Sequence, residues 1–231
     1  MRELWISPSD LSYFLSDSKV GFYDKYVLNI LRPKGVFPSV FNTIDQGMKD
    51  CFDSKPIADF VEGAPTGILR HNEEYVQSQL VKLDDNFSVG FKGKIDSLLD
   101  HEDGTHTVID YKTTHLSDKL KEIYWLQLMA YAFCLEKPLM STPKKISNIG
   151  LIVFQPTLGM EATIGKASLN GSLHYVDLNF DKKRFKEWLA QELLPLLNQE
   201  RDGIFVSYDD KSWARYVNCF HLEDVEEVAV P

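Results

Sequence analysis

The sequence predicts an α/β protein with a mixed central β-sheet flanked by helices. Both ends of the chain show helical periodicity, whereas the middle shows alternating segments bounded by turn residues. The 231 residues are 44% hydrophobic and 26% charged, which excludes a disordered or low-complexity chain. We expect a single domain with an N-terminal helical part (1–60), a sheet with one helix (61–180) and a C-terminal helix and tail (181–231).

The N-terminal part is expected to contain two helices. Ser7 can cap a helix that begins at Pro8, because proline suits the first helical position. An aromatic-rich stretch follows from Leu11 to Leu31, and the turn residues at 32–35 end it. A second helix is expected over about Ser39 to Phe52.

The rest of the chain is expected to form strands around a long helix. The alternating segments predict strands over residues 75–83, 87–99, 105–111, 149–155, 161–167 and 173–178. The long helix opens at Ser117 and Asp118 and continues to about Leu135, because Pro138 stops it. Asp181 to Asn198 is expected to be an amphipathic helix, which Pro195 can kink, with an apolar side formed by Phe185, Trp188, Leu189, Leu193 and Leu197.

A predicted hairpin carries one aspartate on each side of its turn, Asp96 and Asp110. Two registers are possible. A two-residue turn, Asp103-Gly104, would place the two aspartates on opposite faces of the sheet. A three-residue loop with Gly104 in a left-handed conformation would place them directly across from each other, with Cβ atoms about 5 Å apart. We favour the second register because it would bring two carboxylates together, as a metal site requires.

In that register the two carboxylates would repel each other and raise the pKa of one of them. A divalent cation removes this conflict, and hard oxygen ligands on a rigid hairpin suit Mg²⁺ or Mn²⁺. Lys112 is two residues past Asp110, so its side chain points to the same face. Its ammonium could hold an attacking water and neutralise charge on a phosphoryl group. This combination favours metal-assisted hydrolysis of phosphodiesters.

Four motifs occur in order over about residues 5 to 135. They are Ile6-Ser-Pro-Ser-Asp-Leu11 with Phe22-Tyr23-x-x-Tyr26, then Gly93-Lys-Ile-Asp96, then Ile109-Asp-Tyr-Lys-Thr113, and finally Trp125-Leu-Gln-Leu-Met-Ala-Tyr-Ala132. In this order they resemble the PD-(D/E)XK nuclease superfamily, in particular its RecB-like exonuclease branch, which includes the CRISPR-associated RecB-like exonucleases.

The resemblance implies a restriction-endonuclease-like core and a role for each matching residue. Asp96 and Asp110 would bind Mg²⁺ or Mn²⁺, with the Tyr111 carbonyl as a further ligand, and Lys112 would position the water. The helix residues Gln127 and Tyr131, four apart on one face, would lie beside the active site and contact Lys112 or the nucleic-acid backbone.

The chain departs from this resemblance at two places. Many RecB-like members carry a metal-binding histidine on the second helix, and Gln46 falls at that position here, with Asp45 as the alternative if the helix register differs. The iron–sulfur cysteines of many relatives are also absent, since the cysteines are only Cys51, Cys134 and Cys219. We therefore expect no iron–sulfur cluster. Widely spaced cysteines without a CxxC pair also favour a reducing, cytoplasmic setting.

The net charge of −9 argues at first sight against a nucleic-acid partner. Charge is uneven, however, because residues 61–117 contribute −5 whereas residues 118–198 contribute +2. The resemblance implies a deoxyribonuclease, an exonuclease or a single-strand or flap nuclease, in recombination, repair or mobile-element defence. A helicase or recombination factor would be its protein partner, and no membrane segment is expected. The alternative is a nuclease-fold subunit that binds DNA or protein with little catalysis.

Overall fold

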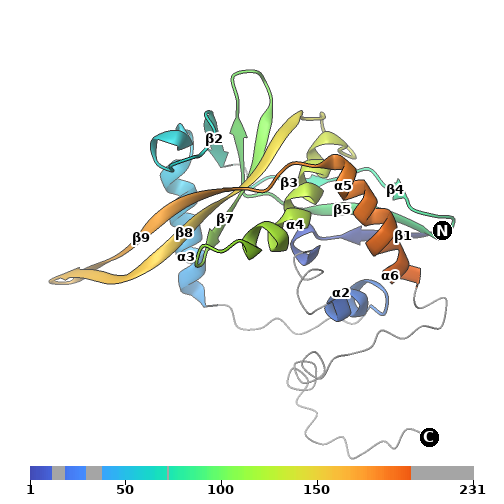
Figure 1. The fold of residues 1–231 in the computed structure, drawn as a ribbon, viewed down its shortest axis with the longest axis horizontal. Coiled ribbons are helices and arrows are strands. Elements are labelled where there is room, and N and C mark those ends of the chain that lie inside the picture. The colour runs from blue at the N-terminus through green and yellow to red at the C-terminus, as the bar shows by residue number, and fades with distance from the viewer. Residues whose placement is uncertain (12–18, 30–37, 72, 199–231) are drawn as a thin grey trace, which may run out of the picture.

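The computed structural model describes residues 1–11, 19–29, 38–71 and 73–198 (Figure 1). Its architecture is two mixed β-sheets flanked by helices, which confirms the α/β class, although the sequence predicted a single central sheet. The helices are α2 (Lys19–Tyr26), α3 (Ser39–Phe52), α4 (Lys119–Glu136), α5 (Lys182–Trp188) and α6 (Leu194–Asn198).

The first sheet is built around β5 (Phe87–Lys94). β1 (Arg2–Ile6) pairs with β5 in parallel, whereas β3 (Tyr75–Gln77) and β4 (Val81–Lys82) pair with it antiparallel. The sequence did not predict β1, because its five residues show no clear alternation and its partner lies far along the chain. After β1, the described residues of this N-terminal part form a 3-10 turn at Pro8–Leu11 and the helix α2, while residues 12–18 and 30–37 lie outside the described part.

The second sheet has the strand order β2-β6-β7-β8-β9. Its strands are β2 (Ile68–His71), β6 (Ser97–Asp100), β7 (His106–Thr113), β8 (Ile146–Thr163) and β9 (Lys166–Asp177). The helix α4 connects β7 to β8, which run parallel, while the other neighbours are antiparallel.

Two predicted strands are divided differently in the structure. Residues 87–99 form β5 and β6 in separate sheets, and the break between the two strands falls at Ile95 and Asp96. Residues 161–167 are not one strand, because the chain turns at Ile164 and Gly165, where Gly165 has a φ of 75°. β8 and β9 therefore extend together as a long two-stranded ribbon (Figure 1).

The hairpin between β6 and β7 adopts the three-residue loop. Ser97 pairs with Ile109, and Gly104 has a φ of 76°, so Asp96 falls across from Asp110 one position beyond the last ladder pair. The loop is closed by the His101 N–H, which donates to the Thr105 carbonyl at 3.0 Å. The register favoured from the sequence is confirmed.

Gly104 therefore gives a test of the hairpin geometry. A methyl group there would meet no atom within 4 Å, so Gly104→Ala should lose only the backbone cost of a left-handed alanine, roughly 1–2 kcal/mol of unfolding free energy. Gly47 lies inside α3, where a methyl also meets nothing, so Gly47→Ala should instead stabilise the protein by up to about 1 kcal/mol. Urea unfolding measures the change in unfolding free energy for both variants. If both substitutions stabilised or both destabilised the protein, the left-handed conformation assigned to Gly104 would be contradicted.

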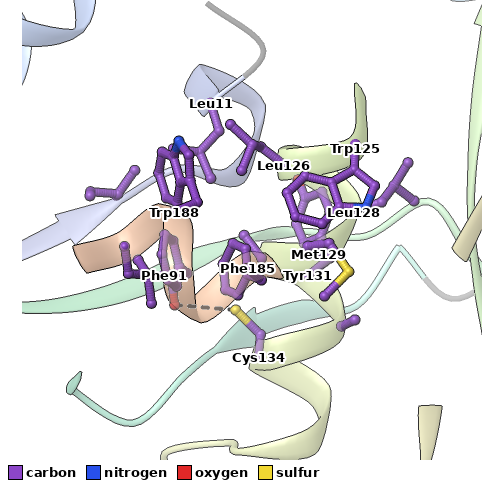
Figure 2. Close-up of a cluster of buried hydrophobic side chains, with 14 of the residues drawn as sticks. Leu11, Phe91, Trp125, Leu126, Leu128, Met129, Tyr131, Cys134, Phe185 and Trp188 are labelled. Carbon is purple, nitrogen blue, oxygen red and sulfur yellow. Dashed lines mark hydrogen bonds between the residues drawn. The ribbon is translucent and has the colours of Figure 1, made fainter. Parts of the chain in front are cut away.

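The main hydrophobic core lies between α4, the first sheet and the C-terminal helices. The five residues predicted for the apolar side of the last helix are all buried. That helix is not continuous, since a π-helical turn at Leu189–Leu193 separates α5 from α6 just before Pro195, which cannot donate a backbone hydrogen bond. Figure 2 shows Phe185 beside α4, where the Cys134 thiol donates to the Phe91 carbonyl.

β7 is buried on both faces. Its residue Val108 belongs to the main core, which runs from Leu4 to Leu197, whereas Ile109 and Tyr111 belong to a second cluster beneath α3. Because strand side chains alternate, Asp110 points to the same side as Val108, toward α4. Apolar packing on both faces of β7 thus fixes the direction in which the Asp110 side chain points. The single-domain organisation stays a prediction.

Within the described ranges, no helix is long and apolar enough to cross a membrane. Cys51 is exposed and Cys134 is buried, and both are free thiols, while Cys219 lies outside the described residues. The cytoplasmic location stays a prediction.

Candidate active site

A polar pocket lies where β5 ends, where β7 carries Asp110 and where α3 and α4 face each other. Its volume is about 630 Å³. The lining residues are Ser9, Phe41, Asn42, Asp45, Lys94, Asp96, Asp110, Tyr111, Lys112, Thr113, Tyr124, Gln127 and Tyr131. The structure therefore brings six of the seven site residues predicted from the sequence to one place, and Gln46 is the exception.

Asp110 is the most buried carboxylate of the pocket, with 9% of its side chain exposed. Its Oδ1 accepts a hydrogen bond from the Gln127 amide at 3.1 Å. Its Oδ2 forms an ion pair with the Lys112 ammonium but accepts no hydrogen bond of ordinary geometry. Burial raises the pKa of Asp110 well above its usual range, the Lys112 charge opposes this rise, and the nearby Asp96 carboxylate adds to it.

Asp96 is more open, with 23% of its side chain exposed. It lies at the break between β5 and β6, where the chain passes from one sheet to the other. Its Oδ1 is 3.0 Å from the Lys49 ammonium, and its Oδ2 accepts a weak hydrogen bond from the Tyr111 N–H at 3.4 Å. The two aspartates therefore share the pocket, and each is paired with a different lysine.

Lys112 points into the pocket from β7, two residues after Asp110. Its ammonium lies 4.8 Å from the centre of the Tyr124 ring, a cation–π contact with a residue of α4. Burial alone would lower the pKa of Lys112, but the Asp110 carboxylate more than compensates, so the net pKa is raised. The side chain is therefore an ammonium at neutral pH.

Gln127 and Tyr131 lie on the pocket face of α4, as expected from their spacing of four. The Gln127 contact is with Asp110 rather than with Lys112. Tyr131 approaches β5 closely because Gly93 has no side chain, and a Cβ there would lie 3.2 Å from the Tyr131 ring. Burial, and then the nearby Asp110 and Asp96 carboxylates, raises the pKa of Tyr131, so its hydroxyl stays protonated.

Tyr111 turns its side chain away from the pocket. Its ring packs in the cluster beneath α3, and its hydroxyl forms a hydrogen bond with the Ser97 hydroxyl at 3.2 Å. Only the backbone of Tyr111 is therefore available to the site. Its role as a carbonyl ligand stays a prediction.

Gln46 is not brought to the pocket. Its side chain is exposed on α3, and its amide donates to the Asp50 carboxylate at 2.7 Å. Asp45, the alternative considered from the sequence, lines the pocket instead. The phase of the helix explains the difference, because Met48 and Phe52 are buried and Asp45 lies three and seven residues before them on that side. That apolar spacing was a usable signal for Asp45.

Sequence reasoning missed three charged residues next to the site: Lys49, Glu73 and Lys94. Lys49 forms ion pairs with Asp45 and Asp96, and Glu73 forms ion pairs with Lys49 and Lys94. The spacing of four between Asp45 and Lys49 was the one available signal. The sequence contains no comparable signal for Glu73, because Lys49 and Lys94 are distant in the chain and contact it only after folding.

The donor set of the pocket fits a hard divalent cation. Among the described residues, no group of three or more His, Cys, Asp or Glu side chains is arranged to hold a metal ion. Asp96 and Asp110 nevertheless present carboxylate oxygens to one pocket, where Asp110 Oδ2 is buried beside the Lys112 ammonium. Mg²⁺ is usually held by one or two carboxylates together with waters, so these residues fit it.

One of three comparisons with known proteins identifies a family. The model of a family described as the PD-(D/E)XK nuclease superfamily matches residues 57–219. A search of the curated proteins finds no match. A solved structure titled "Crystal structure of SSO0001" is similar at 12% sequence identity with a TM-score of 0.46, over 99% of this chain and 89% of that one. That likeness is too low to carry an argument.

Proposed function

Because the chain belongs to the PD-(D/E)XK nuclease superfamily, we propose that it is a divalent-metal-dependent nuclease that hydrolyses phosphodiester bonds in DNA. One observation carries the proposal: Asp96, from the break between β5 and β6, and Asp110 and Lys112, from β7, converge on one pocket. Burying a carboxylate beside an ammonium is costly, and such arrangements concentrate at functional sites.

Each residue has a role in this proposal. Asp96 and Asp110 would hold Mg²⁺ or Mn²⁺, and the ion would supply Lewis-acid activation of the scissile phosphate. Lys112, as an ammonium, would donate hydrogen bonds to the attacking water and to the phosphate oxygens, so that it stabilises negative charge in the transition state. Gln127 would fix the orientation of Asp110 through the 3.1 Å hydrogen bond.

Two aromatic side chains that line the pocket favour a single-stranded substrate. Phe41 from α3 and Tyr124 from α4 line the pocket, and Phe41 has 37% of its surface exposed. Unpaired bases stack on such rings, whereas a duplex hides the faces of its bases. We therefore propose an exonuclease or a single-strand or flap nuclease. A role in recombination, repair or mobile-element defence, beside a helicase or recombination factor, belongs to the same proposal.

Cleavage of end-labelled single-stranded DNA in Mg²⁺ or Mn²⁺ tests the activity. Lys112→Met removes the ammonium but keeps the length of the side chain, and we expect the cleavage rate to fall by roughly 10²–10⁴-fold. Lys92→Met is the matched control, because Lys92 is exposed on β5 outside the pocket and its loss changes net charge equally. Full activity in Lys112→Met would refute the assignment.

A nuclease-fold binding subunit is the second candidate. Asp96 and Asp110 are already paired with lysines, and the described residues hold no ready-made cluster of three metal-binding side chains. Metal-independent binding of single-stranded DNA, without cleavage in any divalent metal, would favour this candidate over the first.

A further inference from the structure

Lys49 is a buried cation beside the pocket. It belongs to α3, and only 6% of its side chain is exposed. Its ammonium lies 2.8 Å from Asp45 Oδ2, 3.0 Å from Asp96 Oδ1 and 3.3 Å from Glu73 Oε1. The three carboxylates come from three segments: α3, the segment before β3, and the break between β5 and β6. The folded chain thus assembles a group of carboxylates around one ammonium.

Lys49 neutralises this group of carboxylates. Its ammonium contacts all three of them, and Glu73 alone also pairs with a second ammonium, that of Lys94. Without the Lys49 charge, the Asp45 and Asp96 carboxylates would lie near each other with no ammonium between them.

The backbone at Glu73 is strained in a way that serves this cluster. Glu73 has a φ of 36°, a conformation that residues other than glycine rarely adopt. Its second carboxylate oxygen pairs with Lys94, so the side chain is held by two ammonium groups. Such strain persists only where the surroundings fix the residue, and it concentrates at functional sites.

Asp96 connects this cluster to the proposed metal site. One of its oxygens contacts Lys49, while its carboxylate lines the same pocket as Asp110. In nucleases that use two metal ions, the ions lie about 3.5–4 Å apart. Here one oxygen of Asp96 is already paired with an ammonium, at an N···O distance of 3.0 Å.

We propose that the Lys49 ammonium takes the place of a second metal ion, so that the chain binds one divalent cation at Asp96 and Asp110. The inference deepens the proposed nuclease function and rests on it. Lys49 is a positioning residue in this scheme, because it holds Asp96 and neutralises the carboxylates around it. The site is therefore assembled before any divalent ion arrives.

Mn²⁺ titration calorimetry of three proteins tests this inference. The wild type is expected to bind one ion per chain. Lys49→Met, which keeps the side-chain length but removes the charge, is expected to bind two, because Asp45 and Asp96 then lose their ammonium partner. Lys92→Met is the matched control, since it also removes one positive charge but lies exposed outside the pocket and leaves Lys49 in place, and it should still bind one.

The wild-type result decides the matter even if Lys49→Met fails to fold. Electron paramagnetic resonance of the wild type saturated with Mn²⁺ should show an isolated ion, and the spectrum of a coupled pair would overturn the inference. A folded Lys49→Met that binds one ion would overturn it as well. Absence of any Mn²⁺ binding by the wild type would overturn the proposed function too, whereas two bound ions would overturn only the inference on Lys49.

Discussion

Replacement of Asp110 by asparagine is expected to abolish DNA cleavage and to weaken Mn²⁺ binding by more than about 100-fold. Loss of a residue that merely supports a metal ligand costs about 10–100-fold in affinity, and Asp110 is proposed as a ligand itself. The asparagine keeps the size of the side chain and can still accept the Gln127 hydrogen bond through its amide oxygen. The substitution therefore removes the charge with little change in packing.

The same substitution leaves Lys112 without its counter-ion. The Asp110 charge is what keeps the pKa of Lys112 raised against the effect of burial, so the lysine in Asp110→Asn loses its proton more easily. Asp110→Asn therefore weakens both metal binding and the positive charge of Lys112. This is why we expect a larger loss of cleavage rate than in Lys112→Met.

Asp103→Asn is the matched control for this prediction. Asp103 is on the loop of the same hairpin, where its carboxylate accepts hydrogen bonds from Thr105, and it does not line the pocket. The control removes an equal charge and should bind Mn²⁺ like the wild type. If Asp110→Asn bound Mn²⁺ with wild-type affinity in calorimetry, Asp110 would not be a ligand and the site as drawn would be wrong.

The central hairpin shows what local sequence can predict. Asp96 and Asp110 could be placed opposite each other because the loop has only two plausible lengths and Gly104 suits the left-handed position. Side-chain alternation then set the direction of Lys112, and helical spacing set that of Gln127 and Tyr131. All of these inferences use contacts between residues near in the chain.

The missed features depend on contacts between distant segments. β1 exists because Leu4 and its neighbours pair with β5, and nothing within residues 2–6 indicates that partner. Glu73 reaches Lys49 only when the segment before β3 packs beside α3. The choice of Gln46 over Asp45 was an error of one helix position, and one position rotates a side chain by about 100° around the helix.

Phe185→Ala is expected to lower the free energy of unfolding by about 3–5 kcal/mol, the usual cost of a large cavity in a packed core. Phe185 is 3% exposed, and its ring lies 5.8 Å from that of Phe91 and 5.9 Å from that of Trp188, with which it is stacked. Figure 2 shows it between α5 and the residues of α4, so its loss removes contacts on both sides. Such a loss is a large fraction of the stability of an ordinary domain.

Phe60→Ala is the control, because Phe60 is 44% exposed and its truncation should cost only about 1 kcal/mol. Urea unfolding followed by tryptophan fluorescence measures both variants. At temperatures where Phe185→Ala stays folded, its Mn²⁺ affinity should equal that of the wild type, since Phe185 does not line the metal pocket. A loss of stability no greater than that of Phe60→Ala would mean that α5 does not pack on α4.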